Sequence, residues 1–248
     1  MGTGNRIVKK SDMAYRRVQL KISGEGLASP DGFGIDAEAL ERSASEIQKV
    51  YALGTEIAVT VGGGNILRGN RFAQESRIPE ATAHYMGMLA TVMNSLALQE
   101  TLESMDVPTR VMSSIAIASV CEPYVRRRCV RHLEKGRVVV LAAGTGRPFV
   151  TTDTAAALAS VEIKADVLFK ATQVDGVYSD DPKKKPDATL YEKLTYDQVI
   201  DERLGIMDVS AVDMCQRHGV PIVVFNLHKS GNMKRVVQGE AVGTIISA

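Results

Sequence analysis

Residues 170–182 read KATQVDGVYSDDP and follow a short apolar run, residues 166–169, that predicts a buried strand. The stretch combines a lysine, a threonine, a tyrosine and several carboxylates in a loop that glycine and proline punctuate. This mixture is typical of a nucleotide site, because lysine binds phosphate, an aromatic ring offers its face to a base, and a carboxylate faces metal-bound phosphate. The alternative is an ordinary loop between a strand and a hairpin.

Strands and helices alternate on both sides of this stretch. Further buried strands are predicted over residues 18–22, 57–61, 109–112, 138–141, 221–225 and 244–246. Helices are predicted over residues 36–53, 86–105, 123–135, 152–163, 196–204, 209–218 and 232–238. The alternation predicts an α/β fold, a three-layer αβα sandwich with a mainly parallel central sheet. Because no repeat or linker interrupts it, we expect one domain over residues 15–248 after a polar N-terminal extension, residues 1–14.

The composition argues against several classes of protein. A net charge of +1 does not suit a general nucleic-acid or membrane surface, so neither partner is expected. Three cysteines without CxxC spacing and four scattered histidines argue against a structural metal or a disulfide framework, and fit a reducing compartment. The N-terminal segment has no apolar signal region, and no apolar run approaches the roughly 20 residues that span a bilayer. We therefore expect a cytoplasmic protein.

Two glycine-bearing clusters follow the first two predicted strands. Residues 21–24, Lys-Ile-Ser-Gly, end the first strand, where the lysine can reach a phosphate and the glycine lets the backbone approach a ligand. Residues 62–64 are three successive glycines, and Arg68 follows them. Such a run suits an anion-binding nest of backbone amides with the arginine as a bidentate donor, and a tight turn is the alternative. Ligands of open α/β sheets lie at the carboxyl ends of strands, so we expect both clusters at one site.

A third cluster, residues 143–153, reads AGTGRPFVTTD and follows the predicted strand at 138–141. Thr151 or Thr152 can cap the helix that begins there, whose N-terminus favours an anion. Bound phosphates would repel Asp153 unless it pairs with cations, and we expect Lys21 and Lys170 to be those cations. The alternative for Asp153 is a simple acidic residue in a first helical turn. The chain contains neither a P-loop motif nor a Rossmann glycine fingerprint.

Taken in this order, the clusters resemble the amino-acid-kinase fold and, within it, the family of bacterial uridylate kinases. The resemblance covers the chain from about residue 15 to its end, and residues 62–68, 86–94, 144–153 and 170–182 are its most specific parts. It implies transfer of a phosphoryl group from Mg²⁺-ATP to UMP, giving UDP and ADP in de novo pyrimidine nucleotide biosynthesis. It also implies a homohexamer with GTP and UTP as effectors. No residue is assigned as a metal ligand, since Mg²⁺ enters with ATP.

The resemblance also implies a role for each residue of the site. The catalytic residues would be Lys21, Arg68, Asp153 and Lys170. The ATP-binding residues would be Lys21, Ile22, Ser23, Gly24, Gly64, Arg68, Thr172, Tyr178 and Asp181. The UMP-binding residues would be Gly63, His84, Thr145, Gly146, Arg147, Pro148, Phe149, Val150, Thr151 and Thr152.

Two departures from the family pattern concern ligand contacts. Many members carry an aspartate that holds the UMP ribose where this chain has His84, which either bonds a ribose hydroxyl or is a surface residue at a helix start. Members that GTP activates carry basic residues at the positions of Gln99 and Glu103, whereas Arg110 and Arg137 match. Because a carboxylate repels a triphosphate, we expect weak GTP activation or none.

Two other functions stay open from the sequence. One is another small-acid kinase of the same fold, acting on carbamate, aspartate or acetylglutamate. The polar loop over residues 145–152 argues against it, because this loop is large enough to hold a nucleotide phosphate and base. The other is a non-catalytic nucleotide-binding storage or sensor protein, which would lack catalytic cations, yet Lys21, Arg68 and Lys170 are present together with Asp153.

Overall fold

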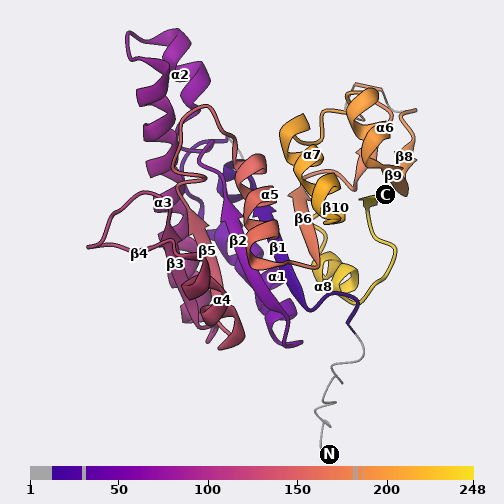
Figure 1. Cartoon of the computed structure of the whole chain (residues 1–248), viewed down its shortest axis with the longest axis horizontal. Coiled ribbons are helices and arrows are strands. Elements are labelled where there is room, and N and C mark those ends of the chain that lie inside the picture. Colours follow the sequence, from indigo (N-terminus) through magenta and orange to yellow (C-terminus); the bar gives the residue numbers. More distant parts are fainter. Residues whose placement is uncertain (1–12, 30–31, 181, 183, 186) are drawn as a thin grey trace, which may run out of the picture.

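A mainly parallel sheet runs through the middle of the molecule (Figure 1). The structure, a computed structural model, describes residues 13–29, 32–180, 182, 184, 185 and 187–248, and in these residues nine strands form the sheet in the order β4-β3-β5-β2-β1-β6-β10-β11-β9. Strands β10 and β11 pair antiparallel, and the other neighbours pair in parallel. The bounds are β1 Arg17–Ile22, β2 Glu56–Val61, β3 Thr109–Ser113, β4 Glu122–Pro123, β5 Val138–Ala142, β6 Val167–Thr172, β9 Lys193–Thr195, β10 Ile222–Asn226 and β11 Thr244–Ser247.

Helices cover both faces of this sheet. Helices α1 (Ala37–Tyr51), α3 (Glu80–Ser104) and α8 (Asn232–Val237) supply the buried residues of one face, and α4 (Arg126–Glu134), α5 (Thr152–Ile163) and α7 (Val209–His218) those of the other. The shorter elements are the 3₁₀ turn η2 (Gly24–Leu27), α2 (Gly69–Glu75), α6 (Tyr196–Asp201) and the hairpin of β7 (Val177–Tyr178) with β8 (Leu190–Tyr191). The predicted αβα sandwich with a mainly parallel sheet is confirmed.

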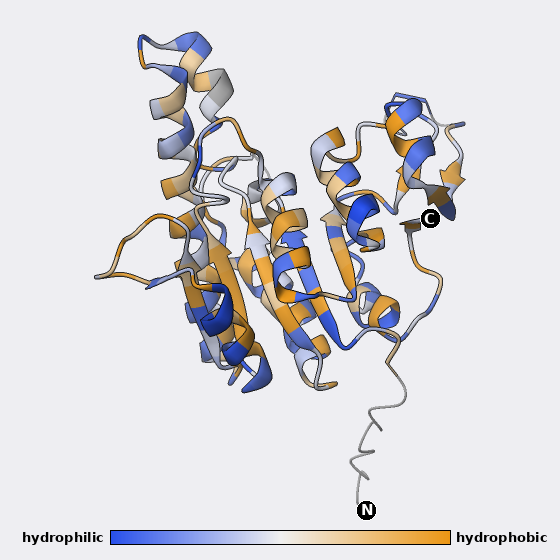
Figure 2. Cartoon of the chain, viewed as in Figure 1, coloured by the Kyte–Doolittle hydropathy of each residue, from blue (hydrophilic) through white to orange (hydrophobic). Residues whose placement is uncertain are grey.

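Along the strands, alternate side chains point either into the hydrophobic core or to the opposite face of the sheet. In β1, Val18, Leu20 and Ile22 are buried in the core beneath α1 and α3. Gln19 and Lys21 therefore face the opposite layer, because successive side chains of a strand point to opposite faces. Figure 2 shows many apolar residues on the strands, with polar residues interspersed on the central ones and concentrated on helices such as α4. A lysine near a strand end thus leaves the sheet on the face that carries α5.

Local signals account for several helix ends. Asp36 caps α1, since its Oδ1 accepts a hydrogen bond from the Ala39 amide at 2.8 Å. Thr151 caps α5 in the same way through the Thr154 amide. Helix α7 ends at Gly219, whose φ of 65° lies in the left-handed region that favours glycine. These residues are local in sequence, which is why the predicted boundaries of α1, α5 and α7 lie close to the observed ones.

Other boundaries differ from the prediction. Helix α3 begins at Glu80, six residues before the predicted start at 86. Helix α4 begins at Arg126, after 123, because the Tyr124 amide bonds to the Ser113 carbonyl and keeps the preceding residues extended beside β3. The short elements α2, β7, β8 and β9 were not predicted. Residues 1–12 of the expected N-terminal extension lie outside the described residues. None of the helices formed by the described residues has the length and apolar character to cross a membrane.

Candidate active site

Two lysines leave neighbouring strands side by side. In the parallel register, Lys21 of β1 pairs with Lys170 of β6, and each side chain is buried, with 8% of the residue exposed. Asp153, in the first turn of α5, lies between them. Its Oδ1 is 3.0 Å from Nζ of Lys21 and its Oδ2 is 2.6 Å from Nζ of Lys170. The structure thus contains the expected ion pairs of Asp153 with both lysines.

Burial and charge set the protonation of this cluster. Burial acts to raise the pKa of Asp153, but the ammonium groups of Lys21 and Lys170 outweigh it and hold the pKa below its usual value. Burial and repulsion by Lys21 lower the pKa of Lys170 to about 8, although Asp153 partly opposes them. Asp153 is therefore ionised at neutral pH, and Lys170 loses its charge as the pH rises through about 8.

The glycine turns approach their neighbours too closely for side chains at three positions, and at the first of them, Gly62, a Cβ would lie 2.8 Å from the amide nitrogen of Gly24. A Cβ on Gly24 would lie 2.7 Å from the amide nitrogen of Gly64, and a Cβ on Gly63 would lie 2.6 Å from the carbonyl oxygen of Gly87 in α3. Gly64 differs, because its Cβ would meet the Arg68 side chain at an ordinary 3.8 Å. Close packing therefore requires glycine at Gly24, Gly62 and Gly63, whereas the packing around Gly64 leaves room for a Cβ.

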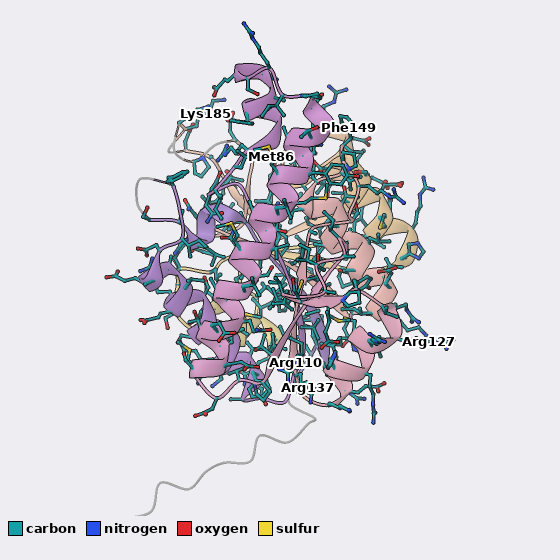
Figure 3. The ribbon with its side chains drawn as sticks, turned by 90° about the vertical axis from the view of Figure 1, so that its left-hand side faces the viewer. Met86, Arg110, Arg127, Arg137, Phe149 and Lys185 are labelled. Atoms are coloured by element: carbon teal, nitrogen blue, oxygen red, sulfur yellow. The ribbon has the colours of Figure 1, made fainter. Side chains whose placement is uncertain are left out.

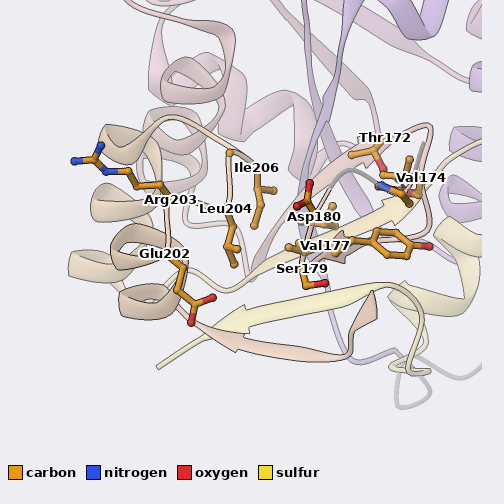
Figure 4. A pocket seen from close by; sticks show the side chains of 14 residues that line it. Thr172, Val174, Val177, Ser179, Asp180, Glu202, Arg203, Leu204 and Ile206 are labelled. Atoms are coloured by element: carbon orange, nitrogen blue, oxygen red, sulfur yellow. Dashed lines mark hydrogen bonds between the residues drawn. The ribbon is translucent and has the colours of Figure 1, made fainter. Parts of the chain in front are cut away.

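One cavity is lined by Lys21 and Lys170, and two further cavities share other lining residues with it. The central cavity, of about 480 Å³, is lined by Lys21, Ser23, Gly24, Glu25, Gly62, Gly63, Gly64, Thr152, Lys170, Ala171, Thr172 and Gln173. The threonine-loop cavity, of about 350 Å³, lies between α3 and residues 144–152. The hairpin cavity, of about 500 Å³, lies between the β7 hairpin, residues 202–206 and β10, as Figure 4 shows.

The expected ATP-binding residues lie along the central and hairpin cavities. Lys21, Ser23, Gly24, Gly64 and Thr172 line the first, and Thr172 and Tyr178 line the second. The side chain of Ile22 is in the core, with 1% of the residue exposed, so its backbone alone is available to a ligand. Arg68 forms an ion pair with Glu25 at the edge of the central cavity. Asp181 lies outside the described residues.

Most of the expected UMP-binding residues line the threonine-loop cavity. These are Gly63, His84, Thr145, Arg147, Phe149, Val150, Thr151 and Thr152. Gly146, with a φ of 72°, packs against Ser114, where a Cβ would lie 2.9 Å from the carbonyl oxygen. Pro148 belongs to the same loop, between lining residues. His84 contacts the protein itself, because its Nδ1 accepts a hydrogen bond from the Phe149 amide at 2.6 Å.

Residues 202–206 and Asp208 escaped the sequence analysis. Residues 202–206 form a wall of the hairpin cavity, and their signal in the sequence is weak, a glycine after a short helix. Asp208 accepts hydrogen bonds from the hydroxyls of Thr151 and Thr154, and thereby ties the start of α7 to the start of α5. No spacing rule links Asp208 to residues so far away in the chain, so only the fold reveals the contact.

Comparison with known proteins gives one consistent result. The model of the amino acid kinase family matches residues 16–226. A uridylate kinase from Methylococcus capsulatus is 50% identical over 236 residues, which cover 95% of this chain and 98% of that protein. The chloroplastic uridylate kinase PUMPKIN of Arabidopsis thaliana is 52% identical over 237 residues, which cover 96% of this chain and 70% of that protein. The crystal structure of UMP kinase from Bacillus anthracis superposes with a TM-score of 0.91 at 40% identity, covering 94% of this chain and 96% of that one.

Proposed function

The chain belongs to the amino acid kinase family, and from that premise we propose that it transfers the γ-phosphoryl group of ATP to UMP, giving UDP and ADP. It is a nucleoside monophosphate kinase, and the product UDP would serve de novo pyrimidine nucleotide biosynthesis. The relatives that share about half of its residues along nearly its whole length are uridylate kinases. The small-acid kinases considered from the sequence are not favoured.

The observation that carries the proposal is the way the three cavities share walls. Thr172 lines both the hairpin cavity and the central cavity, while Gly63, Gly64 and Thr152 line both the central cavity and the threonine-loop cavity. The three cavities are therefore neighbours, and Lys21 and Lys170 line the central one. A base in the hairpin cavity and phosphates in the central cavity would place the donor against an acceptor in the threonine-loop cavity.

In phosphoryl transfer, these residues would position the substrates and neutralise negative charge. A phosphate monoester has a second pKa near 6, so the acceptor phosphate is already a dianion at neutral pH and needs no general base. Its oxygen attacks the γ-phosphorus while the bond to the β-phosphate breaks, and negative charge spreads over the transferred group. Lys21 and Lys170 would neutralise this charge, and Asp153 would hold their ammonium groups in place. Arg68 would leave Glu25 to meet phosphate.

The donor set of the site fits Mg²⁺ that arrives with ATP. Both oxygens of Asp153 face lysine ammonium groups, and the described residues contain no cluster of three histidine, cysteine or acidic side chains that could hold a metal. Mg²⁺ typically keeps phosphate and water ligands and takes few from protein. When bound, the ion would supply charge neutralisation on the ATP phosphates.

The direct test is ADP release with each nucleoside monophosphate and each small-acid acceptor in turn. We expect turnover with UMP to exceed that with CMP, carbamate, aspartate and acetylglutamate by orders of magnitude. The Asp153→Asn protein, purified in the same way, controls for a contaminating kinase. Release of ADP with an acyl acceptor and none with UMP would overturn the assignment.

We also propose that the chain assembles as a homohexamer, with helix α3 at a subunit contact. Tyr85, Leu89 and Met93 recur every fourth residue along α3, so they share one helix face. They are 41%, 48% and 53% exposed, an apolar stripe that a second subunit would cover. Sedimentation of the unmodified protein and of Leu89→Glu tests this proposal, since the glutamate would break the contact.

The location and the effector response are further proposals. Cys121, Cys129 and Cys215 are free thiols, as a reducing cytoplasm allows.

For the effectors, Figure 3 shows Arg110 and Arg137 at the end of the molecule opposite Phe149. Each already has a partner in the protein, because Arg110 pairs with Glu103 at 2.9 Å and Arg137 contacts Nδ1 of His132 at 3.0 Å. Because Gln99 and Glu103 stand where members that GTP activates carry basic residues, we propose a weak or absent response to GTP, with UTP as the remaining effector.

A further inference from the structure

His84 lies where α3, the start of α2 and the loop over residues 144–151 meet. It is the fifth residue of α3, and its side chain is 15% exposed. On the α2 side, a Cβ added to Gly69 would lie 3.1 Å from Cδ2 of the imidazole. On the loop side, the ring of Phe149 has its centroid 4.9 Å from that of His84. The imidazole is therefore packed between two segments.

The hydrogen bond between His84 and Phe149 defines the tautomer. A backbone amide can only donate, so Nδ1 of His84, 2.6 Å from the Phe149 nitrogen, must carry a lone pair. The neutral ring then has its proton on Nε2, which lies 3.7 Å from Oε1 of Glu80 one turn earlier in α3. Both ring nitrogens thus face groups of the protein.

Phe149 needs such a partner. Its φ is 65°, in the left-handed region that residues with a Cβ rarely adopt. The residue is 64% exposed, so burial of the side chain does little to hold it there. Phe149 also stands three residues before Thr152, and Val150, Thr151 and Thr152 all line the threonine-loop cavity. The conformation at Phe149 consequently sets where this wall of the cavity lies.

We propose that His84 is a positioning residue. By accepting a hydrogen bond from the Phe149 amide, it holds the loop over residues 144–151 in its binding conformation. The inference rests on the proposed function, because it makes this loop part of the UMP site. His84 acts on UMP through the loop and does not bond the ribose.

This role predicts a specific split between kinetic constants. The hydrogen bond pre-forms the acceptor site before UMP arrives, and its loss weakens ground-state and transition-state binding of UMP alike. Replacing His84 by Leu should therefore raise the KM for UMP by about three- to tenfold, which is what loss of one hydrogen bond produces. The turnover number should stay within about twofold, and the KM for ATP should not change.

Two polar replacements separate positioning from mere packing. The Oδ1 of Asn is reached over the same number of bonds as Nδ1 of His, whereas the acceptor of Gln lies one bond further out, near the position of Nε2. His84→Asn should thus restore the KM for UMP toward that of the unmodified protein, and His84→Gln should behave like His84→Leu. Glu80→Gln is the matched control for hydrogen exchange, since it changes the partner of Nε2 and leaves the Nδ1 bond intact; Glu80 lines the threonine-loop cavity, so its KM for UMP is not used as a reference.

Hydrogen exchange of the Phe149 amide tests the bond without any nucleotide. We expect this amide to be protected in the unmodified protein, in Glu80→Gln and in His84→Asn, and to exchange at least about tenfold faster in His84→Leu and His84→Gln. Equal protection in all five proteins, or an unchanged KM for UMP in His84→Leu, would overturn the inference. The unmodified protein could fail to phosphorylate UMP and still show the expected exchange pattern. That result would overturn the proposed function but would support the positioning of the loop by the hydrogen bond from the Phe149 amide to His84.

Discussion

Lys21 and Lys170 are register partners on neighbouring parallel strands, so two ammonium groups leave the sheet side by side in a buried site. Such a pair is unfavourable by itself, because like charges repel and burial penalises both. Asp153 offsets this cost by presenting one carboxylate oxygen to each lysine. The arrangement gives two cations a defined position before any phosphate binds, which is the condition for electrostatic stabilisation of a transition state.

The first prediction concerns Asp153. Asp153→Asn should leave the fold intact and lower turnover with UMP by more than about tenfold, because the lysines lose the anion that positions them. Turnover is measured at saturating ATP and UMP, and folding by circular dichroism. Asp213→Asn, which breaks an exposed ion pair with Arg217 on α7, is the matched control and should change neither turnover nor the circular dichroism spectrum. Full turnover in a folded Asp153→Asn protein would contradict the role of this residue.

The second prediction is a pH dependence. Lys170 is a cation below its pKa of about 8 and neutral above it, so kcat/KM should fall as the pH rises through about 8. Lys170→Arg should abolish this fall, because a guanidinium keeps its charge to beyond about pH 12. In Asp153→Asn the attraction that opposes deprotonation is lost, so the fall should move to lower pH. A fall near pH 8 that persists in Lys170→Arg would assign it to another group.

The third prediction compares two adjacent glycines. Gly63→Ala places a methyl group 2.6 Å from a backbone oxygen of α3 and should lower the free energy of unfolding by about 1–3 kcal/mol. Gly64→Ala meets only a flexible arginine side chain at 3.8 Å and should change it by less than about 0.5 kcal/mol. Urea denaturation of both variants measures the difference. Gly64→Ala should still weaken ATP binding, whereas equal stability losses would show that the turn adjusts freely.

The fourth prediction concerns GTP. Glu103 accepts hydrogen bonds from Arg110 and from the Thr109 amide, while Gln99 accepts one from the Val111 amide, so both side chains are engaged at the start of β3. We expect GTP to activate the unmodified enzyme weakly or not at all. The double change Gln99→Arg with Glu103→His should strengthen the response, since one charge-assisted bond is worth about 1.5–3 kcal/mol. Glu103→Gln alone is the control, because it loosens the hold on Arg110 without adding a cation.

The measurement is initial rate against GTP concentration at fixed ATP and UMP. Several-fold activation of the unmodified protein at micromolar GTP would show that other residues hold the effector. The Arg110–Glu103 pair would not prevent such activation by its strength alone, because both side chains are more than a third exposed.

The sequence alone predicted the alternation of strands and helices, and it placed the glycine clusters and Asp153 at strand ends. These signals are local, since an apolar run, a cap such as Asp36 or a glycine turn depends on residues that are neighbours in the chain. The expectation that Lys21, Asp153 and Lys170 meet followed from a general rule for parallel sheets, by which carboxyl ends of strands gather at one edge. The short strands around the β7 hairpin were not predicted, because segments of two or three residues carry too little periodicity to give such a local signal.

Tertiary structure alone decided which side chains touch across the site. The register that sets Lys21 beside Lys170, the bond from Phe149 to His84 and the contact of Thr151 with Asp208 each join segments that the sequence leaves unconnected. A shift of one residue in a strand would turn a side chain to the other face, and a different loop path would separate the same residues without changing any local pattern. Local chemistry therefore determined what the site contains, and packing of distant segments determined how it is arranged.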